Sequence, residues 1–316
     1  MSVSVVMATY NGEKYIQEQL DSIRTQSVSP DEVIICDDCS TDNTVKVVEK
    51  YIKLYKLENK WKIYKNEYNL GYADNFNKVA EMANGTFVLF ADQDDIWLNN
   101  KIEISIETMQ KYQDCQVLCT DYEPFLDGEE VPKPPRSVLK QMPNNGTLEK
   151  ITLNKKSVYI RALGCCMCIR KTFLQDVEKY WFDGWAQDDR MWRLAQCADG
   201  CYLLHLNLVR HRIHGNNTST YGKYHTVEKR IQLFENMQEA NKQMLQMKYN
   251  TGIGREIQLL NKHIEMMKLR LILLKKGELK CLIQLIRYLP YYQKVKSFLV
   301  EFYLVVKEKR WEKAMK

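Results

Sequence analysis

The first 120 residues alternate between short apolar runs and longer segments with helical spacing. This repetition most limits the fold, because parallel strands need crossover connections, usually helices, whereas antiparallel strands can be joined by tight turns. Strands are predicted at residues 2–8, 32–36, 61–65 and 87–91. The chain is therefore expected to form a parallel-rich α/β sheet, in which ligands bind beyond the carboxyl ends of the strands.

Three of these strand ends carry polar or acidic side chains: Ala8-Thr9-Tyr10, Asp37-Asp38 and Asp92-Gln93-Asp94-Asp95. Neighbouring carboxylates repel each other, and a bound Mg²⁺ or Mn²⁺ ion removes this repulsion. Another interpretation is open for each acidic cluster. The acids at 92–95 could stabilise a helix N-terminus, and those at 37–38 could belong to a turn in which Ser40 or Thr41 caps the next helix.

The 316 residues are enough for two domains, and the charge is unevenly divided between them. The net charge of +6 combines −5 on residues 1–220 with +11 on residues 221–316, where 20 Lys and Arg face 9 Asp and Glu. From about Val227 onward apolar residues recur at helical spacing, and Gly277 and Pro290 divide this region into several helices. We therefore predict one domain at residues 1–220 and a basic helical region at residues 221–316.

Several other classes of protein are disfavoured. No apolar stretch approaches the roughly 20 residues of a bilayer-spanning helix, and residues 1–10 lack the basic start of a signal peptide. A cytoplasmic protein with mostly reduced cysteines is expected, and Cys36-x-x-Cys39 has no second cysteine pair at zinc-site spacing. The glycine-rich motifs G-x-G-x-x-G and G-x-x-x-x-G-K-[ST] are absent from the sequence.

Four motifs follow one another in the first domain: Ala8-Thr9-Tyr10-Asn11-Gly12, Asp37-Asp38-Cys39-Ser40-Thr41-Asp42, Asn69-Leu70-Gly71 and Phe90-Ala91-Asp92-Gln93-Asp94-Asp95-Ile96-Trp97. In this order and spacing, the sequence resembles the family 2 glycosyltransferases over about residues 1–220. The last motif is most similar to that of bacterial rhamnosyltransferases and related enzymes of surface-polysaccharide assembly. The resemblance implies the GT-A fold, a Rossmann-like mixed α/β sheet, here followed by a C-terminal helical region. It also implies a TDP- or UDP-sugar donor, Mn²⁺ or Mg²⁺, and transfer with inversion.

The same resemblance implies a donor site. Thr9 and Tyr10 are expected among the nucleotide-binding residues, with Tyr10 against the pyrimidine ring, and Asp38 is expected to accept a hydrogen bond from the N3–H group of the base. Asp92 is expected near the ribose and the metal, and Asp94 is expected to bind the metal directly.

The stretch Trp185-Ala186-Gln187-Asp188-Asp189-Arg190-Met191-Trp192 resembles the family segment that supplies the catalytic base. Its register places Asp188 at the base position, with Asp189 as the alternative. The glutamine before Asp188 departs from the usual His or Glu, and two acids that only begin a helix are the other interpretation. Trp185 and Trp97 are expected to offer apolar platforms to the acceptor or to a sugar.

Residues Val209 to Asn217 resemble the closing segment of the family, Tyr-Arg-x-His-Gly-x-Asn. Arg212 and His214 are expected to donate to the diphosphate leaving group, where charge develops during transfer. His214 could instead bind the metal as a neutral imidazole. A proline-rich stretch from Glu123 to Pro143 is predicted to be a loop that borders the site.

The resemblance therefore implies an inverting glycosyltransferase that moves a sugar, with rhamnose as one candidate, to a hydroxyl of a polysaccharide or lipid-linked oligosaccharide. A sugar nucleotidylyltransferase is disfavoured, because the first strand is not followed by a Gly-rich loop that contains arginine. A non-catalytic polysaccharide-assembly or nucleotide-sugar-binding protein is the alternative.

The basic helical region predicts a second kind of partner. Its lysines and arginines alternate with apolar and aromatic residues, most densely after Gly277. Such a surface suits peripheral binding to an anionic membrane, at the inner face of the cell membrane. The same apolar stripes also suit a homodimer through the C-terminal helices. Nucleic acid is not expected, because no recognised reading module accompanies the charge.

Overall fold

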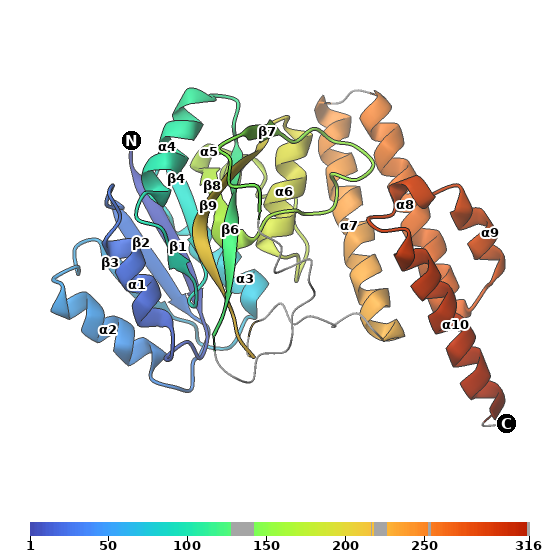
Figure 1. Ribbon diagram of the computed structural model, residues 1–316, viewed down its shortest axis with the longest axis horizontal. Helices are drawn as coiled ribbons and strands as arrows, with labels where there is room; N and C mark the ends of the chain where they lie inside the picture. The colour runs from blue at the N-terminus through green and yellow to red at the C-terminus, as the bar shows by residue number, and fades with distance from the viewer. Residues whose placement is uncertain (128–141, 216, 218–225, 252–253, 315–316) are drawn as a thin grey trace. The chain divides into compact units, whose positions relative to one another are not determined.

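The computed structural model describes residues 1–127, 142–215, 217, 226–251 and 254–314 (Figure 1). The strands are β1 (Val3–Thr9), β2 (Glu32–Asp37), β3 (Trp61–Lys65), β4 (Phe87–Ala91), β5 (Ile96–Trp97), β6 (Val117–Leu126), β7 (Leu148–Lys150), β8 (Met167–Arg170) and β9 (Cys201–Ile213). The α-helices are α1 (Ile16–Arg24), α2 (Thr44–Leu54), α3 (Tyr72–Glu81), α4 (Lys101–Lys111), α5 (Lys171–Asp176), α6 (Gln187–Cys197), α7 (Val227–Thr251), α8 (Gly254–Lys276), α9 (Lys280–Ile286) and α10 (Lys296–Ala314). Two short 3₁₀ helices are η1 (Gly164–Cys166) and η2 (Leu289–Tyr291).

The described strands form one sheet in the order β3-β2-β1-β4-β8-β6-β9-β5, and β7 pairs with β9. β1 runs parallel to both β2 and β4, and β2 runs parallel to β3. The predicted strand–helix alternation is therefore confirmed over the first four strands. The sheet is mixed as a whole, because β4 pairs with β8 in the antiparallel direction.

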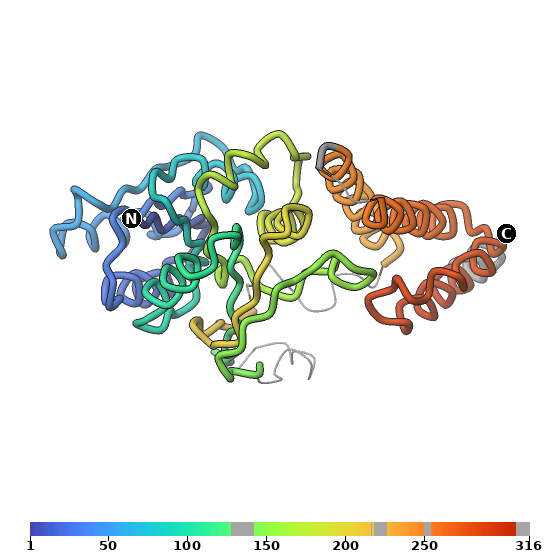
Figure 2. Tube along the Cα trace, turned by 90° about the horizontal axis from the view of Figure 1, so that it is seen from above, coloured from blue at the N-terminus to red at the C-terminus, as the bar shows by residue number. Residues whose placement is uncertain are grey.

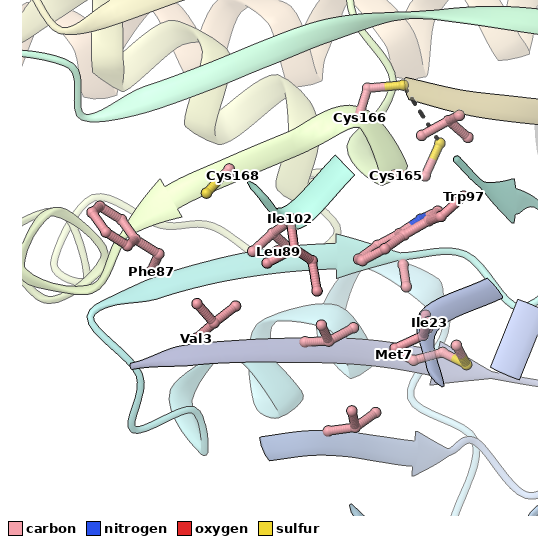
Figure 3. Packing of buried hydrophobic residues seen from close by; sticks show 14 of the residues in the cluster. Val3, Met7, Ile23, Phe87, Leu89, Trp97, Ile102, Cys165, Cys166 and Cys168 are labelled. Atoms are coloured by element: carbon pink, nitrogen blue, oxygen red, sulfur yellow. Dashed lines mark hydrogen bonds between the residues drawn. The ribbon is translucent and has the colours of Figure 1, made fainter. Parts of the chain in front are cut away.

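Both faces of the parallel strands are buried under helices. Val3, Val5 and Met7 of β1 pack with side chains of α1, α2 and α4 in one apolar cluster (Figure 3). On the other face, the Phe90 ring of β4 lies 6.0 Å from the Phe76 ring of α3, centroid to centroid. Burial on both faces is the usual state of parallel strands. Because β1, β2 and β4 run parallel, their carboxyl ends lie at the same edge of the sheet.

The prediction of a loop from Glu123 onward is wrong for its first residues, which belong to β6. β6 includes Glu123 and Pro124 and pairs with β9, where Pro124 lies opposite His211. Within β6, only residues 117–119 pair with β8. The later part of β6 is thus not bonded to β8, and proline, which lacks an N–H donor, is tolerated at such an edge. Residues 128–141 of the predicted loop lie outside the described part of the chain.

The chain divides into two compact units, Met1–Ile151 with Arg161–Ser219 and Thr152–Ile160 with Thr220–Lys316. The predicted boundary at 220/221 falls among residues that the structure does not describe. The sequence did not predict that Thr152–Ile160 belongs with the second unit, where the Tyr159 hydroxyl donates to the Tyr291 carbonyl (2.9 Å). All ten cysteines are free thiols, as expected. None of the described helices is long and apolar enough to cross a bilayer.

The second unit is helical, as the periodicity predicts. α7 and α8 lie side by side (Figures 1 and 2), and apolar side chains of α7, α8, α9 and α10 form a second buried cluster. Inside it, the Arg270 guanidinium of α8 donates to both carboxylate oxygens of Glu301 of α10. The guanidinium also lies over the Phe234 ring of α7, 3.8 Å from its centroid, and the Tyr292 hydroxyl donates to Glu301. The buried ion pair therefore joins α8 to α10, and the contact of Arg270 with Phe234 adds α7.

Glu301→Ala should destabilise the second unit by about 3–5 kcal/mol, because the buried Arg270 guanidinium would lose its counter-charge. Hydrogen exchange of the α8 and α10 amides in the intact chain measures this loss. Glu278→Ala serves as the control, since its partner Lys280 is exposed and such pairs contribute little. Unchanged protection in Glu301→Ala would contradict the assigned role of the ion pair.

Candidate active site

The loops that follow β1 and β2 are tied together by short polar side chains. The backbone N–H of Asn11 donates to Ser40 Oγ (2.9 Å), and Asn11 Oδ1 accepts from the backbone N–H of Thr41 (2.8 Å). Asn11 and Cys39 have left-handed backbone conformations, with φ of 49° and 65°. Non-glycine residues rarely adopt them, so such residues are held there by surrounding contacts. This rigid edge carries Tyr10, which is 48% exposed.

Asp38 is buried at the end of β2 and fixes the turn that precedes α3. Its carboxylate accepts hydrogen bonds from the backbone N–H groups of Leu70 and Gly71 and from the side-chain amide of Asn66, each at 2.8 Å. Gly71 has φ of 82°, a conformation that glycine adopts without steric cost. These three hydrogen bonds hold the Asp38 carboxylate in one orientation. The predicted hydrogen bond from a pyrimidine N3–H group would be a fourth contact of this carboxylate.

Gln93, for which the sequence predicted no role, joins the end of β4 to the end of β1. Its side-chain oxygen accepts from the Tyr10 N–H (2.9 Å), and its side-chain nitrogen donates to the Tyr10 carbonyl (3.0 Å). Gly12 leaves the space for it, since a Cβ atom there would lie 2.2 Å from Gln93 Oε1. The Thr9 hydroxyl is turned inward to Asp37 (3.1 Å). Tyr10, predicted to lie against the pyrimidine ring, has an open side chain, whereas Thr9, predicted only as a nucleotide-binding residue, is buried.

The acidic loop after β4 brings three carboxylates together. Asp92, Asp94 and Asp95 each place one oxygen within 4.8 Å of the others. Loss of surrounding water, and then the charges of Asp95 and Asp94, raise the pKa of Asp92 well above its ordinary value. Carboxylate oxygens are the preferred donors for Mg²⁺ and suit Mn²⁺, and a divalent cation would relieve this repulsion. The acidic loop therefore fits the divalent metal that the sequence predicts.

The C-terminal end of β9 supplies basic groups to the acidic loop. Antiparallel pairing of β5 with β9 places His211 Nδ1 2.9 Å from Asp95 Oδ1. Burial disfavours charge on His211, but the adjacent Asp95 carboxylate prevails and raises the pKa of His211 to about 9. Arg212 Nε donates to the Asp94 carbonyl, and His214 Nε2 lies 2.8 Å from Asp94 Oδ2. His214 is thus close enough to Asp94 to share a metal ion with it.

Arg212 lies in a different environment from the one predicted. Its guanidinium contacts the carboxylates of Glu18 (2.7 Å) and Asp127 (3.2 Å) in addition to the Asp94 carbonyl. The residue is only 4% exposed. The prediction that Arg212 offers open donors to a diphosphate is therefore corrected: Arg212 anchors the acidic loop to α1 and to the end of β6.

Asp188 lies in the first turn of α6, close to η1, where a Cβ on Gly164 would come within 3.4 Å of the Asp188 Cβ. The charge of Asp188 contributes to the raised pKa of Asp92, so the two carboxylates interact. Burial, with a smaller contribution from Asp189, raises the pKa of Asp188 to about 6. A carboxylate with a pKa near neutrality is suited to accept a proton from a substrate.

Asp189 is occupied by other protein groups. Its carboxylate accepts from the Trp185 indole N–H (2.9 Å) and from Arg193 Nε (2.6 Å), one turn further along α6. Trp185 stacks on Phe182 with ring centroids 4.8 Å apart. Asp189 therefore fastens the segment before α6 to the helix.

The two predicted tryptophan platforms are corrected by the structure. Trp97 is 3% exposed and lies inside the apolar cluster of Figure 3, with Lys101 Nζ 4.9 Å from its ring centroid. Trp185 is 2% exposed and covered by Phe182. A sugar stacks on an aromatic ring only where a ring face is open. Trp97 instead packs the core, and Trp185 holds Asp189.

Comparison with known proteins identifies the family to which the chain belongs. The model of the family described as "Glycosyl transferase family 2" matches residues 4–177, more than half of the chain. The chain belongs to glycosyltransferase family 2. The residues matched include β1, the acidic loop and η1, which together form most of the site.

Two curated relatives are named as bacterial sugar transferases. The chain is 37% identical over 109 residues to the UDP-Glc:alpha-D-GlcNAc-diphosphoundecaprenol beta-1,3-glucosyltransferase WfgD of Escherichia coli, covering 34% of this chain and 41% of WfgD. It is 37% identical over 106 residues to the dTDP-rhamnosyl transferase RfbG of Shigella flexneri, covering 33% and 36%. The resemblance to rhamnosyltransferase-like enzymes is confirmed, and the matches span less than half of each relative.

Solved structures of glycosyltransferases share the fold. The Staphylococcus aureus TarS 1–349 complex with UDP has a TM-score of 0.62 and 24% identity, covering 88% of this chain and 74% of that one. The mannosyltransferase PcManGT of Pyrobaculum calidifontis, in complex with GDP-Man and Mn²⁺, has a TM-score of 0.53 and 17% identity, covering 98% and 87%. The predicted GT-A fold with a C-terminal helical region is confirmed.

Asp94→Ala should abolish binding of Mn²⁺ and metal-dependent turnover while preserving the thermal transition, because the carboxylate faces the other acids and not the apolar core. Isothermal titration with Mn²⁺ measures the first effect. Asp176→Ala removes an exposed acid at the end of α5 and should bind Mn²⁺ as the wild type does. Equal Mn²⁺ affinity in Asp94→Ala and Asp176→Ala would contradict the assignment.

Proposed function

We propose that the chain is an inverting, metal-dependent glycosyltransferase of polysaccharide biosynthesis. It would transfer a sugar from a TDP- or UDP-sugar to a hydroxyl of a saccharide or lipid-linked acceptor. The observation that carries the proposal is the position of Asp188 in the first turn of α6 beside η1, whereas Asp189 is held by Trp185 and Arg193. Burial raises the pKa of Asp188 to about 6. Family membership supports the reaction class, and the names of WfgD and RfbG support the class of donor.

In this proposal Asp188 is the general base. Its carboxylate accepts the proton of an acceptor hydroxyl while the hydroxyl oxygen bonds to the anomeric carbon of the donor. The bond between that carbon and the diphosphate oxygen breaks in the same step, and the electron pair leaves with the nucleoside diphosphate. One displacement from the opposite face inverts the anomeric configuration. Asp189 acts indirectly, because its bonds to Trp185 and Arg193 hold the start of α6.

The donor nucleotide would bind at the edge formed by the β1 and β2 loops. The open Tyr10 ring supplies a surface for stacking on a pyrimidine, and Gln93 fixes the Tyr10 backbone on both sides. The buried Asp38 carboxylate supplies an acceptor for the N3–H group, which uracil and thymine share. These residues would thus accept both UDP- and TDP-sugars. Other residues would have to recognise the sugar itself.

Asp94, together with Asp92 and His214, would hold Mn²⁺ or Mg²⁺. When bound, the ion supplies positive charge against the diphosphate that leaves. Arg212 and His211 hold the acidic loop in position, because Arg212 donates to the Asp94 carbonyl and His211 pairs with the Asp95 carboxylate. The structure of PcManGT with Mn²⁺ supports this choice of ion for a relative of the same fold.

The donor sugar is tested by a thermal-shift panel of UDP-glucose, UDP-N-acetylglucosamine and TDP-rhamnose, each with Mn²⁺. TDP-rhamnose is included because RfbG is named as a dTDP-rhamnosyl transferase. A specific donor raises the thermal transition through its preference for the folded state. Binding of a donor without release of nucleoside diphosphate, with any acceptor extract, would favour the alternative of a non-catalytic nucleotide-sugar-binding protein.

Asp188→Asn should lower turnover by about 10²-fold or more with donor affinity preserved, because the base is lost and the nucleotide contacts are not. Asp189→Asn is the matched variant and should cost much less, since an amide oxygen can still accept from Trp185. Release of nucleoside diphosphate at saturating Mn²⁺ measures both. A severe loss in Asp189→Asn with a mild one in Asp188→Asn would reverse the roles of the two acids.

The raised pKa of Asp188 predicts two pH effects. Below about pH 6 the base is protonated, so kcat/KM at saturating Mn²⁺ should fall about tenfold per pH unit. Above that pH the folded chain holds an ionised carboxylate that its surroundings disfavour, so Asp188→Asn should raise Tm near pH 7.5 and leave it little changed near pH 4. A flat kcat/KM profile between about pH 4 and pH 8 would contradict this assignment.

A further inference from the structure

Exposed apolar side chains are concentrated in one part of the second unit. The described residues include 18 large apolar residues with exposed side chains, and seven of them lie between Leu279 and Tyr303. Ile283 of α9 is 75% exposed, more than any other large apolar residue except Met1. Exposed apolar residues that recur in one stretch of the chain are typical of an interaction surface, whereas single exposed apolar residues are ordinary.

The exposed residues follow the helical repeat on the outer faces of α9 and α10. Ile283 and Ile286 are exposed on α9, where Leu285 faces the core. Leu299 and Phe302 are exposed on α10, with Tyr303 beside them. Both helices are therefore apolar on two sides, although the buried cluster needs only one of them. We refer to the exposed apolar and basic residues from 279 to 307 as the α9–α10 surface.

The α9–α10 surface carries charge of one sign. Its exposed ionisable residues are Lys280, Arg287, Lys294, Lys296 and Lys307. The sequence has a single acid between residues 279 and 307, Glu301, which is buried and bound to Arg270. Just outside this range, Glu278 pairs with Lys280 (2.9 Å), so the exposed charge around the apolar side chains is mainly positive. Apolar side chains flanked mainly by positive charge match a surface that is both apolar and anionic.

We propose that the α9–α10 surface binds the anionic leaflet of a membrane. A second copy of the chain fits less well, because a two-fold interface places the same patch against itself and would oppose more basic than acidic side chains. Amphipathic helices with basic flanks lie in the headgroup region with their apolar face inserted by about 5–10 Å. The surface deepens the proposed function, on which its purpose rests, by bringing the enzyme to the layer that holds a lipid-linked acceptor.

Co-sedimentation of the full chain with vesicles tests the proposal. Wild type should bind vesicles of phosphatidylcholine with about 30% phosphatidylglycerol at low salt, and should bind pure phosphatidylcholine at least tenfold more weakly. Ile283→Ser with Phe302→Ser should weaken binding by more than tenfold, because the inserted side chains are removed. Lys294→Gln with Lys296→Gln should weaken it by about 25-fold, from roughly fivefold for each charge.

Matched variants on the first unit serve as controls. Leu54→Ser removes an apolar residue that is 71% exposed on α2, and Lys50→Gln with Lys53→Gln removes two exposed charges from the same helix. Both controls should bind vesicles as the wild type does. Absence of binding, equal losses in test and control variants, or a concentration-dependent dimer that the Ile283 and Phe302 substitutions disperse would overturn the proposal. Because no donor or acceptor is present, failure here leaves the transferase proposal untouched.

Discussion

The site depends on how the fold keeps three like charges together at the edge of a sheet. Asp92, Asp94 and Asp95 follow a buried strand and each place an oxygen within 4.8 Å of the others. Burial, together with their mutual repulsion, raises the pKa of Asp92 well above its ordinary value. The end of β9 offsets it: His211 pairs with Asp95, and the pKa of Asp95 falls despite its burial. His214 Nε2 lies 2.8 Å from Asp94 Oδ2. Protein groups thus offset part of the negative charge of the loop, and a divalent cation can complete the balance.

The first half of this arrangement could be predicted from the sequence. Strand and helix periods are local, so the four parallel strands and the positions of Tyr10, Asp38 and the acidic loop follow from patterns within a few residues. Parallel pairing then brings the strand ends together without further information. The choice between Asp188 and Asp189 was open in the sequence, and it rests on hydrogen bonds from Trp185 and Arg193 that only the folded chain shows.

The rest depends on contacts between distant segments. The pairing of β5 with β9 joins residues more than 110 positions apart, so the sequence gives no local signal that His211 meets Asp95. One available sign was the position of His211 in the same basic segment as Arg212 and His214. The burial of Trp97 and Trp185 was equally hidden, because an aromatic residue beside a motif has the same sequence pattern in the core as on the surface. Sequence patterns specify side chains, whereas their exposure is set by tertiary packing.

The proposed reaction is a single displacement that depends on one base at the start of α6 and on charge compensation at the acidic loop. No covalent intermediate on the protein is needed. The most direct test is proton NMR of the disaccharide linkage formed from a donor of known anomeric configuration. The expected product has the opposite configuration at the anomeric carbon. A product that retains the configuration of the donor would contradict this mechanism, because retention requires two displacements or a different placement of the base.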